Sequence, residues 1–189
     1  MSDSKVVHVI DDDVDVRQSL AFLLSAAGLA VRTHDSAVAF LKALPTLQDG
    51  CIVTDIRMPE MDGLELQKRL KEMKIDMPVI VITGHGDVHL AVSAMKSGAV
   101  DFIEKPFDDE ALLSAIQAAL TQHSDDRRRQ SLVADVRKRL KALSEREKEV
   151  LNGLVAGKPN KIIAYELGIS ARTVEVYRAN VMTKMQADS

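Results

Sequence analysis

The sequence contains no tryptophan, a single cysteine and only 3% aromatic residues among its 189 positions. With one cysteine, Cys51, an internal disulfide is excluded, and its apolar neighbours favour a packed thiol over a catalytic one. No apolar run approaches the roughly 20 residues that cross a bilayer. The stretch from Met1 to Ser4 is also too polar and short for a signal peptide. We therefore expect a cytoplasmic protein without a membrane partner.

Charge is distributed unevenly along the chain, although the net charge is only -3. Residues 1–123 carry 11 Lys and Arg against 19 Asp and Glu, which is a net charge of -8. Residues 124–189 carry 14 against 9, which is a net charge of +5. A basic segment suits a polyanion such as DNA, whereas an acidic one does not. The charge split alone does not exclude ordinary variation of surface charge.

Short apolar runs alternate with helical patterns in the first two thirds of the chain. This alternation predicts an α/β fold, a doubly wound parallel sheet of the (βα)5 type. The strands are expected at 6–10, 30–34, 51–55, 79–83 and 102–104. The helices are expected at 14–27, 36–44, where Pro45 stops the second, 64–73, 88–95 and after Asp108.

The rest of the chain predicts a helical linker and a small all-α domain. No Gly or Pro occurs between Phe107 and Asn152, and the charged stretch 123–141 is expected to be a solvated helix. Ser144 and Glu147 form a capping box for a helix to Val155. A second helix runs from Pro159 and Asn160 to Gly168, and a third from Ser170 to about Met185. We therefore expect domains at 1–122 and 142–189, the second resembling a helix-turn-helix.

Acidic and basic side chains follow the predicted strands, where ligands of doubly wound sheets bind. These are Asp11, Asp12 and Asp13, then Asp55, Thr83 and Lys105. Crowded carboxylates stay ionised only around a cation, and an all-oxygen set suits Mg²⁺. The first turn has no glycine, which argues against a dinucleotide site.

The same residues suit phosphoryl transfer to a carboxylate. Asp55 is the candidate nucleophile, Asp11 and Asp12 the metal ligands, Lys105 the partner of the phosphoryl group and Thr83 its hydrogen-bond donor. Taken singly, each has an ordinary explanation: Asp13 is equally a helix N-cap, Thr83 a strand residue and Lys105 a surface lysine. Their joint placement carries the prediction.

The third helix of the small domain has an apolar side and a side of short polar residues. Val174, Tyr177, Val181 and Met185 are expected to pack against apolar residues of the first two helices, which are Val150, Leu151, Leu154, Ile162, Ile163 and Leu167. The opposite side would read base edges through Arg172, Glu175, Val176, Ala179, Asn180 and Thr183. Phosphate contacts would come from Lys161, Thr173, Arg178 and Lys184. By the helical wheel alone, a solvent-exposed face is equally probable.

Three segments resemble the receiver of two-component response regulators: 11–13, 54–63 and Lys105-Pro106, with 81–86 and 98–107 close to the NarL/FixJ subfamily. The resemblance implies that a cognate sensor histidine kinase phosphorylates Asp55, and that the Arg57 main-chain carbonyl joins Asp11, Asp12 and Asp55 around Mg²⁺. It also implies a cis peptide before Pro106, and a switch in which Thr83 moves and Phe102 reorients. Receivers of the subfamily pair through the face formed by 87–98 and 102–104, so a homodimer on phosphorylation is expected.

The segments 143–151, 160–167 and 170–176 resemble the LuxR-type effector of the same subfamily. This implies a transcriptional activator that binds double-stranded promoter DNA and works with RNA polymerase, controlled by a FixL-like kinase if the similarity is that close. One departure is that the subfamily has a fourth helix, used in dimerisation, beyond the third. We expect that helix to be missing here, which puts effector pairing in doubt.

Two other classes of function compete with this interpretation. Phosphatases of the dehalogenase type also use an Asp at a strand end, but they need a second Asp two residues later, where this chain has Arg57. We therefore expect no enzyme beyond phosphorylation of Asp55 and its slow hydrolysis. A receiver whose helical domain binds protein or RNA is the other class. The histidines do not have zinc-ligand spacing and are expected to be structural or surface residues, at His8, His34, His85, His89 and His123.

Overall fold

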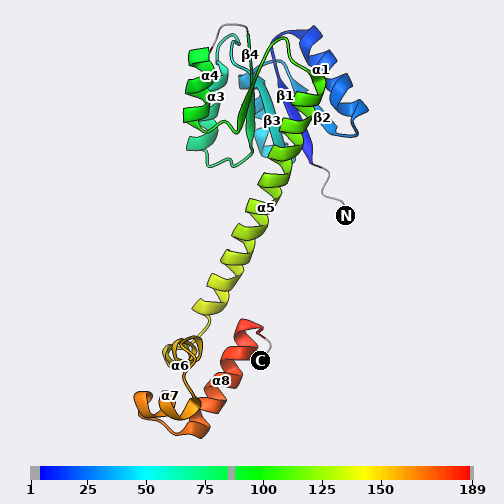
Figure 1. Ribbon diagram of the computed structural model, residues 1–189. Helices are drawn as coiled ribbons and strands as arrows, with labels where there is room; N and C mark the ends of the chain where they lie inside the picture. The colour runs from blue at the N-terminus through cyan, green and yellow to red at the C-terminus, as the bar shows by residue number, and fades with distance from the viewer. Residues whose placement is uncertain (1–4, 85–87, 188–189) are drawn as a thin grey trace. The chain divides into compact units, whose positions relative to one another are not determined.

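The computed structural model describes residues 5–84 and 88–187, which divide into two compact units at 125/126. The first unit is an α/β domain and the second consists of helices (Figure 1). Among the described residues, no helix combines the length and apolarity that crossing a bilayer requires.

Five parallel strands form the sheet of the first unit in the order β2-β1-β3-β4-β5. Their bounds are β1 Val6–Ile10, β2 Ala30–His34, β3 Gly50–Asp55, β4 Val79–Thr83 and β5 Asp101–Glu104. The predicted doubly wound fold is confirmed, and three strands have the expected bounds. The third and fifth begin one residue earlier than expected. At Gly50 a side chain would collide with the main chain of β1, since an added Cβ would lie 1.7 Å from the Val6 carbonyl oxygen.

Helices cover both faces of this sheet. Helices α2 (Ala37–Ala43), α3 (Gly63–Glu72) and α4 (Val88–Ser97) pack one face around a cluster that includes Phe40, Leu66 and Ala94. Helix α1 (Val14–Ala26) and the first part of α5 (Asp109–Lys141) pack the other face, with buried Leu24 and Ile116. Figure 1 shows α3 and α4 on one side of the strands and α1 on the other.

Helix boundaries follow the capping residues. Asp62 accepts a hydrogen bond from the Glu65 N–H and starts α3 one residue earlier than predicted. Helix α2 ends at Ala43, before Pro45 as predicted, and a 3-10 turn, η1 (Leu44–Thr46), follows it with Pro45 inside. A proline is tolerated in a first turn, where its missing N–H has no intrahelical partner. The expected linker 123–141 is the continuation of α5.

Three further helices form the small unit: α6 (Glu145–Val155), α7 (Asn160–Leu167) and α8 (Ala171–Met185). Their core consists of Val150, Ile163, Ala164 and Val174. Gly153 lets α6 and α7 approach closely, because an added Cβ would lie 2.7 Å from the Ile163 side chain. The expectation that Ile162 packs in this core is wrong: it is 47% exposed, because the one-residue step to Ile163 turns it about 100° around α7.

Candidate functional site

Three carboxylates meet at the carboxyl end of the sheet. Asp11 and Asp12 follow β1, Asp55 ends β3, and oxygen atoms of all three lie within 4.8 Å of one another. They meet because β1 and β3 are parallel neighbours, so their ends lie at the same edge. Asp11 is buried, Asp55 is half-buried and Asp12 is exposed, which leaves the cluster open to solvent on one side.

Lys105 brings the positive charge of this site. It follows β5, and its Nζ atom lies 3.4 Å from Asp11 Oδ2 and 4.0 Å from Asp55 Oδ1. The strand β4 separates β5 from β3, so a long side chain is needed to cover that distance. The Lys105–Pro106 peptide bond is cis.

One ammonium does not balance three carboxylates. Burial raises the pKa of the Asp55 carboxyl above its usual value, with Lys105 opposing that rise and Asp11 and Asp12 adding to it. The Ile56 N–H donates to Asp55 Oδ1 at 2.9 Å and also opposes the rise. The excess negative charge and the open oxygen atoms suit a hard cation such as Mg²⁺, which accepts carboxylate, carbonyl and water oxygens.

Asp13 and Arg17 shape the acidic turn. Asp13 is the N-cap of α1, accepting from the N–H groups of Asp15 and Val16, and its own N–H donates to Asp11 Oδ1 at 2.9 Å. Arg17 Nη1 donates to the Asp11 and Asp12 carbonyl oxygens at 2.7 and 3.0 Å. The N-cap alternative for Asp13 is therefore the one observed. Arg17 was not found from the sequence, although an Arg one turn after an acidic run is a usable signal.

The loop after Asp55 is fixed by a close contact with α3. The Gly63 N–H donates to the Ile56 carbonyl oxygen at 2.8 Å. A Cβ on Gly63 would lie 2.6 Å from the Asp55 carbonyl oxygen, so only glycine fits without movement of the phosphoacceptor candidate. The main chain of Arg57 lies within this loop.

Two residues were predicted to switch. Thr83 is buried at the end of β4, beside β5 in the register that pairs it with Glu104. Phe102 is 43% exposed on β5, so it is not a core residue here. Residues 85–87 lie outside the described residues, which leaves His85, Gly86 of the motif and Asp87 of the expected pairing face without a structural account.

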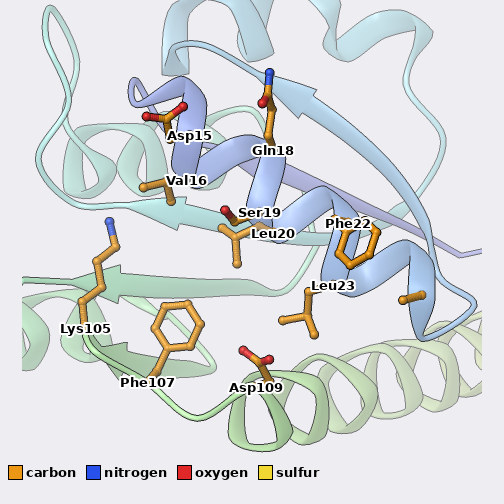
Figure 2. A pocket seen from close by; sticks show the side chains of 11 residues that line it. Asp15, Val16, Gln18, Ser19, Leu20, Phe22, Leu23, Lys105, Phe107 and Asp109 are labelled. Atoms are coloured by element: carbon orange, nitrogen blue, oxygen red, sulfur yellow. The ribbon is translucent and has the colours of Figure 1, made fainter.

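A groove of about 790 Å³ adjoins the acidic site between α1 and the start of α5. Figure 2 shows Lys105, Phe107 and Asp109 facing residues of α1 across it. Phe22 lies in its wall and is 79% exposed. This groove was not predicted, although Phe22, a large aromatic residue on the solvent side of α1, is a usable signal for it.

The predicted DNA-reading side of α8 is exposed. Val174 and Val181 are buried on the other side and Tyr177 packs against the core, as the wheel required. The side chain of Val176 is 57% exposed. The other predicted reading and phosphate-contacting residues are also exposed, except the half-buried Thr173, which bonds to the N-cap Ser170: Lys161, Arg172, Glu175, Arg178, Ala179, Asn180, Thr183 and Lys184.

Lys184 has an internal partner. Its Nζ donates to Glu147 Oε2 at 2.7 Å, and the Glu147 side chain is 5% exposed. To contact a DNA phosphate, Lys184 would have to leave this carboxylate. This pair was not predicted, since the two residues lie 37 positions apart in the sequence.

Comparison with known proteins adds independent evidence. Residues 7–117 match the family described as response regulator receiver domain, and residues 141–189 match bacterial regulatory proteins of the luxR family. The transcriptional regulatory protein FixJ of Azorhizobium caulinodans is 59% identical over all of this chain and 90% of its own length. FixJ of Rhizobium meliloti is 55% identical over 97% of this chain and 90% of its own.

Solved structures agree with these matches. Full-length FixJ from Bradyrhizobium japonicum has a TM-score of 0.66 at 53% identity, covering 98% of this chain and 91% of its own. The response regulator StyR has a TM-score of 0.88 at 41% identity, covering 98% of this chain and 94% of its own.

Proposed function

Because this chain belongs to the response regulators and is a FixJ-like transcriptional regulatory protein with a receiver domain and a LuxR-type DNA-binding domain, we propose that phosphorylation of Asp55 controls its binding to promoter DNA. A receiver implies a sensor kinase as partner, and the luxR-family domain implies DNA binding. The observation that carries the proposal is Asp55 at the end of β3, with Asp11, Asp12 and Lys105 around it.

Each residue of the site has a role in accepting a phosphoryl group. An Asp55 oxygen attacks phosphorus, the phosphorus–nitrogen bond of a phosphohistidine breaks, and the histidine nitrogen keeps the bonding electrons. Asp11, Asp12, Asp55 and the Arg57 main-chain carbonyl would hold Mg²⁺, which when bound supplies positive charge beside the phosphoryl oxygens. Lys105 neutralises further charge. Thr83 donates its hydroxyl to the phosphoryl group.

The α1–α5 groove supports docking of a kinase. It shares Lys105 with the acidic site, so a partner lying in it would reach Asp55, and exposed Phe22 offers that partner an apolar contact. Phe22→Ala should slow phosphorylation by a FixL-like kinase and leave phosphorylation by acetyl phosphate unchanged. Equal slowing with both donors would place the effect at the acceptor site instead.

The face of α4 and β5 supports a homodimer on phosphorylation. Three apolar residues are exposed there, at Val92, Met95 and Phe102. Movement of Thr83 toward the phosphoryl group would free space next to Phe102 and reshape this face. A Lys105→Ala receiver that still dimerised fully on phosphorylation would contradict this coupling.

The reading side of α8 is proposed to enter the major groove of DNA, with the two DNA-binding domains of a homodimer on a two-fold promoter site. The bound homodimer would work with RNA polymerase as an activator. Arg172, Val176 and Asn180 are the candidate base contacts, with Lys161 and Arg178 on phosphates. Turnover should be limited to slow hydrolysis of phosphorylated Asp55. Rapid hydrolysis of small phosphomonoesters would favour a phosphatase, although Arg57 stands where that class needs a second Asp.

The decisive experiment measures binding to a FixJ-type promoter fragment at fixed salt, with and without acetyl phosphate and Mg²⁺. The wild type is expected to bind more tightly after phosphorylation, and Asp55→Asn is expected not to respond. Binding that ignores the phosphoryl donor in the wild type would refute the proposal. Preference for RNA or protein over the promoter fragment would favour the other class of partner.

A further inference from the structure

A buried carboxylate lies where α5 ends and α6 begins. Glu147 is only 4% exposed, although it is charged. One of its oxygens, Oε2, accepts the Ser144 N–H at 2.7 Å, and the Glu147 N–H donates to Ser144 Oγ at 3.2 Å. These two bonds close the capping box of α6. Within this box the carboxylate accepts from the neutral Ser144 N–H, which does not compensate its negative charge.

The compensating charge comes from the last turn of α8. Lys184 Nζ donates to the same oxygen, Glu147 Oε2, at 2.7 Å and to the Ala142 carbonyl oxygen at 3.4 Å. The hydrogen bond from Lys184 is the main reason that the pKa of Glu147 is lowered. Next to it, Arg139 Nη1 of α5 donates to the Met185 carbonyl oxygen at 2.9 Å. Charged side chains therefore tie the C-terminal end of α8 to the corner between α5 and α6.

The contacts made by Lys184 and Arg139 hold the C-terminal end of α8. Helix α8 has 15 residues, so it is about 22 Å long at 1.5 Å per residue. Arg172 and Val176 lie near its other end. A tilt of about 10° at the tied end would move the far end by about 4 Å, enough to lose base contacts. Residues that hold the tied end therefore contribute, together with the core packing of Val174 and Tyr177, to where the reading side points.

We propose that Glu147 and Lys184, named here the corner clamp, are positioning residues that hold α8 at the angle required for reading DNA. On this proposal Lys184 acts through Glu147 and is not a phosphate contact. The inference rests on the proposed role of α8 as the helix that enters the major groove.

The clamp and the phosphate contact predict opposite results for one pair of variants. Glu147→Gln keeps the capping box, since glutamine serves at that position, but removes the charge that holds Lys184. Lys184→Met removes the ammonium and keeps the stem. Glu145→Gln is the matched control: it makes the same charge change two residues away, on a side chain that is 86% exposed and pairs with Lys148 within α6.

Full-length phosphorylated protein would be titrated with a FixJ-type promoter fragment and with a mixed-sequence duplex of equal length, at several salt concentrations. With a clamp, Glu147→Gln and Lys184→Met both raise the promoter Kd about fivefold or more, and the double variant is no worse than either. The salt slope stays unchanged and Glu145→Gln behaves as wild type. With a phosphate contact, Lys184→Met lowers the slope by about one on both duplexes. Glu147→Gln then binds as tightly as wild type or more tightly, and the clamp is refuted.

Amide exchange separates failure of the clamp from failure of the proposed function. Without DNA, the backbone amide hydrogens of residues 182–185 should exchange with solvent about tenfold faster in the Glu147→Gln variant than in the Glu145→Gln variant. Equal exchange in the two variants refutes the clamp, even if both fold. If the wild type does not prefer the promoter fragment, the proposed function fails, while this exchange comparison still decides whether the clamp exists.

Discussion

The acidic site of the receiver and the surface of the LuxR-type unit differ in how their charges are paired. In the receiver, Asp11, Asp12 and Asp55 crowd within 4.8 Å around a single lysine, an arrangement that is unfavourable until a cation binds. In the LuxR-type unit, acidic and basic side chains form close pairs around a small core, at Lys148–Glu145, Arg146–Glu149, Lys158–Glu166 and Lys184–Glu147. A large core tolerates a strained functional site, whereas a small core leaves little stability to spare.

The largest effect on stability is expected from a substitution in the core of the small unit. Ile163→Ala removes one of four central residues and should lower the free energy of unfolding of this unit by about 2–5 kcal/mol. Both tyrosines, Tyr165 and Tyr177, lie in this unit and the chain has no tryptophan, so tyrosine fluorescence in urea reports on it alone. Ile162→Ala in the same helix is the control and should change stability by less than about 0.5 kcal/mol. Equal losses would contradict the observed burial.

The second largest effect is expected in the acidic cluster of the receiver, where a substitution should raise the free energy of unfolding instead of lowering it. Without Mg²⁺, Asp55→Asn should raise the free energy of unfolding of the receiver by about 1 kcal/mol, because it removes a carboxylate whose ionised form is disfavoured by burial. Mg²⁺ should then stabilise the wild type more than the variant. Calorimetry with and without Mg²⁺ measures both, with Asp76→Asn as an exposed control. A variant less stable than wild type without Mg²⁺ would mean that the cluster is not strained.

Lowering the pH should destabilise the receiver but not the small unit, by a smaller amount than the substitutions above. Burial, together with the charge of His8, lowers the pKa of His34 to about 4, and burial also lowers the pKa of His8. The neutral rings pack on Phe40, with centroids 5.7 and 5.0 Å from it. Because the unfolded chain takes up protons below pH 6.5, this stability is present above that pH and is lost as the pH falls toward 4.

From pH 7 to pH 5 the receiver should therefore lose about 1 kcal/mol, after allowance for partial exposure of His34. All five histidines lie in residues 1–123, so tyrosine fluorescence of the small unit should show no matching loss. Melting followed at both pH values tests this, and His34→Gln should reduce the dependence. A receiver whose stability did not change would refute a neutral histidine pair.

The smallest expected effect concerns an exposed ion pair. Lys158 and Glu166 approach to 2.7 Å, but their side chains are 39% and 45% exposed. Glu166→Gln should change the free energy of unfolding by less than about 0.5 kcal/mol, because water screens such pairs. Urea unfolding followed by tyrosine fluorescence measures it. A loss comparable to that of Ile163→Ala would mean that ion pairs, and not the core, stabilise this unit.

The sequence predicted the order of elements well, because local chemistry decides it. Alternating β-branched runs and capping residues such as Ser144 and Ser170 act within a few positions, so the strands, the fold class and the three final helices followed from them. The prediction failed where one helical step changes burial, as at Ile162, and it did not include the 3-10 turn that holds Pro45 after the end of α2. Such details depend on what packs against the chain.

The residues of the candidate site were also predicted only in part from the sequence. Asp11, Asp12, Asp55 and Lys105 were predicted from their places after strands, because parallel strands bring their carboxyl ends to one edge. The sequence by itself therefore determined which chemistry the receiver carries, and that a basic helical unit follows it.

Only the tertiary structure decided how far each charge is compensated. In the folded chain Arg17 donates to carbonyl oxygens of the acidic turn, and Phe22 is exposed in a groove that Lys105 also lines. Lys184 pairs with the carboxylate of Glu147, 37 positions away in the sequence. These outcomes depend on distances between segments remote in sequence. Periodicity and capping cannot set such distances, because they arise only when helices pack on a common core.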